Sequence, residues 1–289
     1  MDTINLVQNP VRNPVQTPVQ NPPSNPIGTL LPALSLCQRE LVRFVRQRNR
    51  IVGALATPIV FWLLIGLGMG HSFNAGAGPD GTDYMRYFFP GTVIMILLFT
   101  AIFSTISIIE DRREGFLQSV LVAPVSRMAI VLGKVLGGTL LAFGQGLLFL
   151  LLAPLIGVSL DLPSFLLACG FLFVVSFALT GLGFCIAWRM SSTQGFHAIM
   201  NLFLMPMWFL SGALFPARGA MRWVMGLNPL TYGLAGLRRA LYFSSLDHAS
   251  AAALLPGWAA CIGVTLLFAV VMFALASLMA RGTVAADLQ

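Results

Sequence analysis

The chain has 289 residues, of which 57% are hydrophobic and 9% are charged, with a net charge of +7. Soluble domains carry about 25% charged residues, so this composition excludes a soluble globular protein and indicates an integral membrane protein. The positive charge does not indicate nucleic acid as a partner, because arginines lie at the ends of apolar runs, as membrane topology requires, and no nucleic-acid motif is present.

Residues 1–28 repeat short Asn-Pro and Thr-Pro units and lack the apolar core of a secretory signal peptide. Proline fixes the backbone and removes hydrogen-bond donors, while asparagine and glutamine bury poorly. We therefore expect a disordered tail over 1–28. The alternative is a proline-rich ligand for a partner domain.

The segment 34–50 is amphipathic when it is placed on a helix with about 100° per residue. Its apolar side comprises Leu34, Cys37, Leu41, Val42, Phe44 and Val45, and its basic side comprises Arg39, Arg43, Arg46 and Arg50. This pattern predicts an interfacial helix, with the arginines directed toward lipid phosphates or a cytosolic partner. A plain positively charged membrane anchor is the alternative, and both roles are compatible.

A helix that crosses a bilayer needs about 20 mostly apolar residues. Six runs qualify, over 51–70, 88–109, 129–153, 164–187, 196–215 and 256–280. The third run is the least clean, because it contains Lys134 and Gln145. We therefore predict an all-α integral membrane protein, with a six-helix domain over 51–281 and a short cytoplasmic tail over 282–289.

Arginine and lysine in short loops set the orientation of such a bundle. If the N-terminus is cytoplasmic, the inner side holds the arginines of 39–50 together with Arg112, Arg113, Arg127, Arg189 and Arg281. The outer side holds Arg86 and, within the long connection 216–255, Arg218, Arg222, Arg238 and Arg239. This bias predicts a multi-pass protein of the inner or plasma membrane with both termini in the cytoplasm.

The inner loop between the second and third spans concentrates charge in Glu110, Asp111, Arg112, Arg113 and Glu114. After Gly115, an apolar face follows at Phe116, Leu117, Val120 and Leu121, before Pro124 and Arg127. This spacing predicts a short amphipathic helix. Such a helix can press its apolar face into a groove on a soluble partner. The alternatives are a helix lying flat on the membrane and a charged stop to membrane insertion.

The connection 216–255 is half apolar but is interrupted by glycines and by Asn228-Pro229, which is a turn signal. We predict two short helices, over 217–226 and 230–243, whose apolar faces dip into the outer leaflet. Trp223, Tyr232 and Tyr242 would lie at the depth of the membrane interface.

Catalytic motifs are absent from the sequence. No G-x-x-x-x-G-K-[ST] phosphate loop or metalloprotease motif is present, and no carboxylate falls in the middle of a span. The cysteines Cys37, Cys169, Cys185 and Cys261 have no metal-site spacing. We expect no catalytic, cofactor or metal site in this chain.

The polar residues within the spans are few. Gln145, Asn201 and Ser211 are candidates for a substrate path, and hydrogen bonding between helices is the alternative. Gly133 and Gly137 form a G-x-x-x-G pattern, which indicates close helix packing.

Two groups of motifs resemble the permeases of ABC type-2 transporters. The first is Glu110, Glu114 and Gly115, followed by "APVSR" over 123–127 and "LGK" over 132–134. The second is "FLSGALFP" over 209–216 and "LNPLTYGLAGLRRAL" over 227–241, which is similar to the drug-resistance and nodulation-factor export branches. The resemblance covers about 34–281, and the tail over 1–28 departs from it.

This resemblance implies a role for each segment. The loop over 110–127 would be the coupling helix, seated in a cleft of a separate ATP-binding subunit, and the helix over 34–50 would border that subunit. The two short helices before the sixth span would form a re-entrant element on the outer side. The chain would be a homodimer, or pair with a close paralogue, and ATP and Mg²⁺ would bind only to the partner ATPase. It would export a drug-like, lipid or lipid-linked saccharide substrate. A secondary transporter or channel without an ATPase is the alternative.

Overall fold

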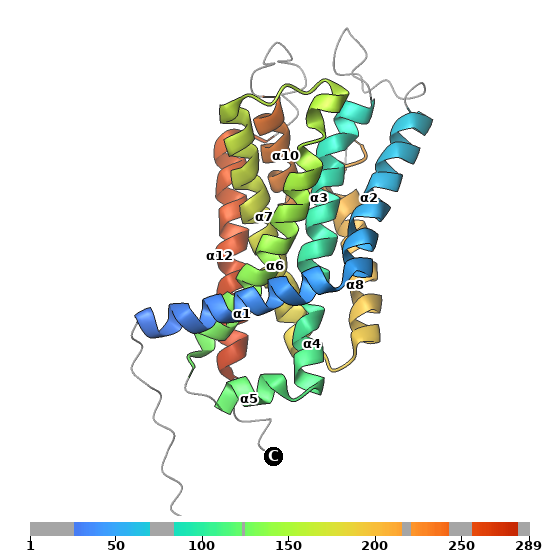
Figure 1. Cartoon of the computed structure of the whole chain (residues 1–289). Coiled ribbons are helices and arrows are strands. Elements are labelled where there is room, and N and C mark those ends of the chain that lie inside the picture. Colours follow the sequence, from blue (N-terminus) through green and yellow to red (C-terminus); the bar gives the residue numbers. More distant parts are fainter. Residues whose placement is uncertain (1–25, 70–83, 123–124, 216–220, 243–255, 283–289) are drawn as a thin grey trace, which may run out of the picture.

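The computed structural model describes residues 26–69, 84–122, 125–215, 221–242 and 256–282 (Figure 1). Within these ranges the chain is helical and contains no strand. Residues 1–25 of the tail predicted over 1–28 lie outside the described residues, whereas 26–28 are helical and not disordered. Pro124, residues 216–220, 243–255 and 283–289 and the side chain of Arg50 also lie outside the described part of the chain. The helices are α1 (Pro26–Arg46), α2 (Arg48–Met69), α3 (Tyr84–Ser104), α4 (Ile106–Arg113), α5 (Phe116–Val122), α6 (Arg127–Leu150), η1 (Ala153–Ile156), α7 (Leu162–Arg189), α8 (Thr193–Phe209), α9 (Met221–Leu227), α10 (Pro229–Leu241) and α12 (Trp258–Gly282).

The long helices form a bundle with α3 at its centre. Of the most apolar stretch in Tyr84–Arg113, 83% is buried, whereas the corresponding fraction in Trp258–Arg281 is 22%. Edge and stacked ring contacts join Trp62 of α2, Phe89 of α3 and Phe149 of α6. α3 is therefore enclosed by protein, while α12 keeps an apolar face toward the surroundings of the bundle.

Among the described residues, four helices are long and apolar enough to cross a membrane: Tyr84–Arg113, Arg127–Ile156, Leu162–Arg189 and Trp258–Arg281. They coincide with the second, third, fourth and sixth predicted spans, so the prediction of an all-helical, multi-pass membrane protein is confirmed. The first predicted span contains a shorter apolar helix, Leu55–Gly68. The fifth contains α8, which is 17 residues long and is followed by a turn at Leu210. The apolar part of α2 and the whole of α8 are shorter than the about 20 apolar residues that usually cross a bilayer.

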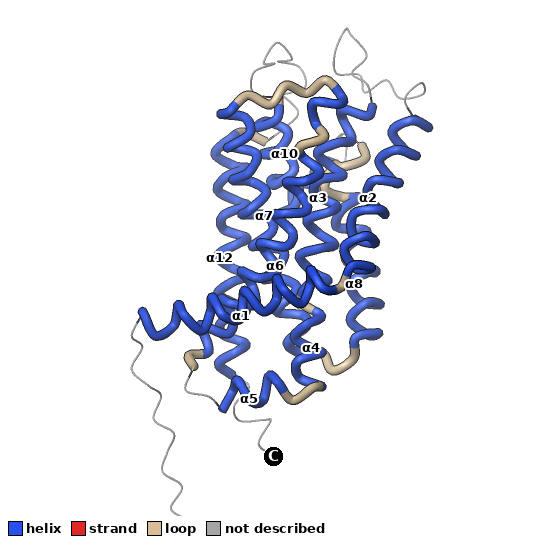
Figure 2. The backbone as a smooth tube through the Cα atoms, viewed as in Figure 1, coloured by secondary structure: helices blue, strands red, loops and turns tan. Residues whose placement is uncertain are grey.

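The predicted interfacial helix starts earlier than expected and is separate from the first predicted span. α1 begins at Pro26 instead of residue 34 and ends at Arg46, and α2 starts at Arg48. Figures 1 and 2 show α1 lying across the lower part of the bundle, in front of α6. We call this end of the bundle, where α1, α4 and α5 gather, the charged end.

The charged loop over 110–127 forms two helices instead of one. α4 continues almost directly from α3, and α5 follows at an angle after Gly115, whose φ of +74° places it in the left-handed region (Figure 2). At the opposite end, α9 and α10 are two short helices separated by Asn228, close to the predicted boundaries. The Asn228 side chain caps α10 by accepting a hydrogen bond from Leu230 N at 3.0 Å.

Candidate functional site

α1 is seated on a glycine groove in α6. A Cβ atom at Gly133 would lie 2.7 Å from the carbonyl oxygen of Ala33, and one at Gly137 would lie 2.8 Å from Cβ of Glu40. Larger residues at these positions would hold the two helices apart, so the G-x-x-x-G pattern serves packing between α6 and α1 of the same chain. This close approach brings Glu40 beside Lys134, which lies between the two glycines.

Six charged side chains meet where α1, α4 and α6 come together, and we call them the ionic cluster: Arg39, Glu40, Arg43, Glu110, Asp111 and Lys134. Arg39 donates two hydrogen bonds to the Asp111 carboxylate, at 3.0 and 2.8 Å, and Arg43 donates one at 2.9 Å. Arg43 also donates to Glu110 at 2.8 Å. The Arg39 pair is the two-bond arrangement in which a guanidinium holds a carboxylate most firmly.

Lys134 completes the ionic cluster from α6. Its Nζ donates to Glu40 Oε1 at 2.5 Å, to Ser107 Oγ at 3.3 Å, and to Asp111 Oδ2. The side chains of Lys134 and Asp111 are 4% and 0% exposed. Charges removed from water to this degree are tolerated only when they are paired and hydrogen-bonded, as they are here.

The ionic cluster shifts the pKa of Arg39. The hydrogen bond to Asp111 is the main cause that raises the pKa of Arg39 above its ordinary value, against the opposing effect of burial. The guanidinium also lies over the ring of Phe116, with Cζ 3.7 Å from the ring centroid. Arg39 thus joins α1 to both α4 and α5.

α5 directs its predicted apolar face inward. Leu117 is buried in the core, and Phe116, Val120 and Leu121 are partly buried against it. Leu117 is therefore covered by this chain, while Phe116, Val120 and Leu121 keep part of their surface exposed. The exposed residues of α5 are Gln118, Ser119 and Val122.

α4 is also tied to the end of α7. Arg112 donates to the carbonyl oxygens of Trp188 at 2.6 Å and Met190 at 3.2 Å, and Arg113 donates to that of Ser191 at 3.0 Å. The last carbonyls of a helix lack partners within it, and cations are favoured there. Two residues that the sequence assigned to coupling thus secure the α7–α8 corner.

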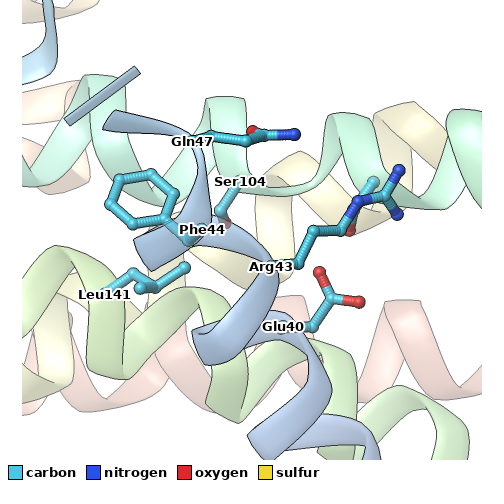
Figure 3. A pocket seen from close by; sticks show the side chains of 7 residues that line it. Glu40, Arg43, Phe44, Gln47, Ser104 and Leu141 are labelled. Carbon is cyan, nitrogen blue, oxygen red and sulfur yellow. The ribbon is translucent and has the colours of Figure 1, made fainter. Parts of the chain in front are cut away.

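A small pocket borders the ionic cluster (Figure 3). Phe44 and Leu141 lie at one end of it, and Glu40 and Arg43 at the other; Gln47, Ser104 and Ser107 complete the lining. Across the described residues, no three His, Cys, Asp or Glu side chains are placed to hold a metal ion.

The three residues predicted for a substrate path lie in different surroundings. Gln145 is buried and accepts a hydrogen bond from Thr100, which is the interhelical alternative considered from the sequence. Ser211 is buried and donates to Trp208 O at 2.6 Å, whereas Asn201 is exposed on α8. The substrate path stays a prediction.

Sequence reasoning missed the burial of Arg238 at the opposite end. This residue is 8% exposed, and its Nη2 donates to Gly212 O at 2.9 Å, while Cζ lies 4.2 Å from the centroid of the Tyr87 ring. In the described part of the chain, Arg238 is held by carbonyl oxygens and a ring instead of a carboxylate. The position of Arg238 on the inner face of an amphipathic α10 was the signal available in the sequence.

Comparison with known proteins agrees with this architecture. The sequence matches the ABC-2 type transporter membrane domain over residues 33–242. The transport permease ycf38 of Cyanophora paradoxa is 24% identical over 208 residues, which is 70% of this chain and 71% of that protein. Nodulation protein J of Rhizobium meliloti is 28% identical over 203 residues, covering 68% of this chain and 76% of the relative. Nodulation protein J of Sinorhizobium fredii is 31% identical over 168 residues, covering 57% and 63%.

The matched region includes most of α1 together with the ionic cluster, α5 and α10, so the site lies within the matched domain. Because the match extends over most of the chain, this protein belongs to the ABC-2 type transporter family and is a multi-pass membrane permease.

Proposed function

We propose that this chain is the membrane subunit of an ATP-binding cassette exporter, driven by a separate ATPase subunit in trans. Family membership implies an ABC ATPase partner. The observation that carries the proposal is the corner at Gly115, where α5 is held by its apolar face and by Arg39 and presents its polar face outward.

The exposed face of α5 is the proposed docking surface for that ATPase. Gln118 and Ser119 offer hydrogen-bonding groups, and Val122 is 87% exposed. Glu114 and Arg113 add charge beside them and are also exposed. This surface replaces the apolar face that the sequence suggested, because Phe116, Leu117, Val120 and Leu121 pack inward.

The proposed assembly is a homodimer, or a pair with a close paralogue, in the inner or plasma membrane. Six spans form when α2 and α8 are counted with the four longer helices, and both termini are cytoplasmic. The excess of arginine and lysine at the charged end supports this orientation. α9 and α10 are the proposed re-entrant elements on the outer side.

The proposed substrate is amphipathic: a drug-like molecule, a lipid or a lipid-linked saccharide. Its support is the scarcity of charge within the bundle away from the two ends. Nodulation protein J is the name of three of the similar proteins. ATP and Mg²⁺ would bind to the partner.

The alternative is a secondary transporter or channel. Buried carboxylates that could carry a proton or cation are present in Glu40 and Asp111, but each is paired with basic side chains at the end of the bundle. Co-purification separates the two functions. The exporter retains an ABC ATPase whose hydrolysis responds to substrate, and a secondary transporter retains none.

Substitution on the two faces of α5 tests the docking surface. Val122→Asp should reduce recovery of the ATPase in a pull-down from nanodiscs without lowering the melting temperature, because a charge is placed in a desolvated contact. The matched control is Leu155→Asp in η1, which alters a residue that is 81% exposed beside the turn before α7, at the opposite end. Full ATPase recovery by Val122→Asp would contradict docking through this face.

A further inference from the structure

Within the ionic cluster, Lys134 is contributed by α6, the third predicted span, whereas the other five members belong to α1 and α4. An ammonium group has three hydrogen-bond donors. All three are used, on Glu40 of α1 and on Ser107 and Asp111 of α4. A single side chain of α6 is therefore hydrogen-bonded to two other helices.

α1, α4 and α5 are already joined to one another without Lys134. Arg39 and Arg43 bind Asp111, and Arg39 covers the ring of Phe116. These contacts make α1, α4 and α5 one unit. Lys134 supplies the directional bonds from that unit to α6, where the other contacts, such as those at Gly133 and Gly137, are van der Waals packing.

The link continues along the interface between α3–α4 and α6. Thr100, Ser104, Ser107 and Asp111 recur at i, i+4, i+7 and i+11, which places them on one helical face. They meet Gln145, Gly138 and Lys134 in the reverse order along α6: Thr100 donates to Gln145, Ser104 lies against Gly138, and Ser107 and Asp111 accept from Lys134. A polar seam thus runs from the ionic cluster into the bundle.

A buried ion pair is a poor source of stability compared with apolar side chains of similar volume, but its directional bonds can fix the register of neighbouring elements. Apolar contacts between helices resist separation more than sliding. The ion pairs of Lys134 with Glu40 and Asp111 oppose both separation and sliding of the helices.

We propose that Lys134 is a positioning residue that passes movement of the α1–α4–α5 unit into α6, so that α6 shifts when the ATPase pushes on α5. This inference rests on the proposed function, since it concerns how the action of the ATPase enters the membrane. Lys134 acts through Glu40 and Asp111 and touches neither nucleotide nor substrate.

The test is hydrogen–deuterium exchange of the permease–ATPase complex in nanodiscs, with and without Mg-ATP and orthovanadate. In the unaltered complex, nucleotide should change the exchange of 116–122, of α1 and of the first turns of α6 (127–140). In Lys134→Met, 116–122 and α1 should still respond, and the response of 127–140 should be lost. Lys134→Gln, which keeps a polar side chain of similar length, should reduce that response. A purely structural role would change exchange equally in both nucleotide states and leave the difference intact.

Arg189→Met is the matched control, because it removes an exposed cation from the charged end that has no partner shown among the described residues. It should leave all three responses unchanged. A nucleotide response at 127–140 that persists in both Lys134→Met and Lys134→Gln would overturn the proposal, as would its absence in the unaltered complex while 116–122 responds. If 116–122 itself does not respond, the docking of the ATPase on α5 fails instead. If Lys134→Met does not fold, Lys134→Gln alone decides.

Discussion

At the scale of single residues, Gly115 sets the angle between α4 and α5. Its φ of +74° lies in the left-handed region, and a Cβ atom there would meet nothing within 4 Å. The constraint at this position is therefore conformational and not steric. Its backbone N–H also donates to Arg112 O at 3.3 Å, which closes the last turn of α4.

Two substitutions at Gly115 should distinguish backbone strain from loss of the angle between α4 and α5. Gly115→Ala should lower the free energy of unfolding by about 1 kcal/mol, because an L-residue pays that amount in the left-handed region, and should keep the ATPase bound. Gly115→Pro cannot reach this φ and loses the N–H donor, so it should also release the ATPase. Thermal unfolding in detergent and a pull-down measure the two effects.

The control is Gly144→Ala on α6, where a Cβ atom also meets nothing within 4 Å but the backbone is helical. It should be neutral or slightly stabilising, since alanine favours a helix by about 1 kcal/mol over glycine. Tight ATPase binding by Gly115→Pro would show that binding does not depend on the angle between α4 and α5.

At the scale of elements, the seat of α1 on α6 decides whether the ionic cluster can form. The carbonyl of Ala33 and Cβ of Leu36 would both lie within 2.8 Å of a Cβ at Gly133, whereas a Cβ at Gly137 meets the side chain of Glu40. Cβ of Glu40 is fixed to its own backbone and cannot yield freely either, but alanine at Gly133 would crowd two residues of α1, including a carbonyl oxygen, whereas alanine at Gly137 would crowd Glu40 alone. The two glycines should therefore differ in their tolerance of alanine.

Gly133→Ala should displace α1 and cost about 1–3 kcal/mol of stability, as overpacking of a close contact does, and Gly137→Ala should cost less. The measurement is maleimide labelling of Cys37 in a chain whose other cysteines are replaced. Cys37 is 5% exposed, and burial, then the nearby Glu40, raise the pKa of its thiol. Labelling should be slow in the unaltered seat and fast in Gly133→Ala. Equal, slow labelling of both glycine variants would mean that α1 does not depend on this groove.

The elements divide into those that the sequence could predict and those that it could not. Apolar length was enough to find α3, α6, α7 and α12, and the Asn228-Pro229 turn was enough to separate α9 from α10. The inward face of α5 was not predictable, because its spacing of Phe116, Leu117, Val120 and Leu121 fits a groove on a partner as well as one on the same chain. The choice between these two surroundings depends on how α1 and the core pack against α5, which local spacing does not show.

At the scale of the whole molecule, the ionic cluster joins residues that are far apart in the chain. Arg39 and Asp111 are 72 positions apart, and Lys134 and Glu40 are 94 apart. The sequence did flag Lys134 as a charge inside an apolar run, and Gly133 and Gly137 as a packing surface. Pairing them required the three-dimensional arrangement, since no local spacing connects a lysine in one span with a carboxylate in a helix before the first.

Orientation in the membrane is the property of the whole chain that the charges predict. The charged end carries Arg46, Arg127 and Arg189 besides the ionic cluster, and it is also where α12 ends, with Arg281 in its last turn (Figure 1). Since basic residues in short loops favour the cytoplasmic side, this end should lie inside the cell. The turn between η1 and α7 belongs to the opposite end and should be accessible from outside.

Single cysteines in a chain without its native ones test this orientation in intact cells. Ser159→Cys, in the exposed turn before α7, should react with a membrane-impermeant maleimide added outside. Arg189→Cys, exposed at the other end of the same helix, should react only after the membrane is opened. Because the two positions flank α7, the pair also shows that this helix crosses the bilayer. Reaction of Arg189→Cys from outside, with Ser159→Cys protected, would invert the topology and place α5 away from any cytoplasmic ATPase.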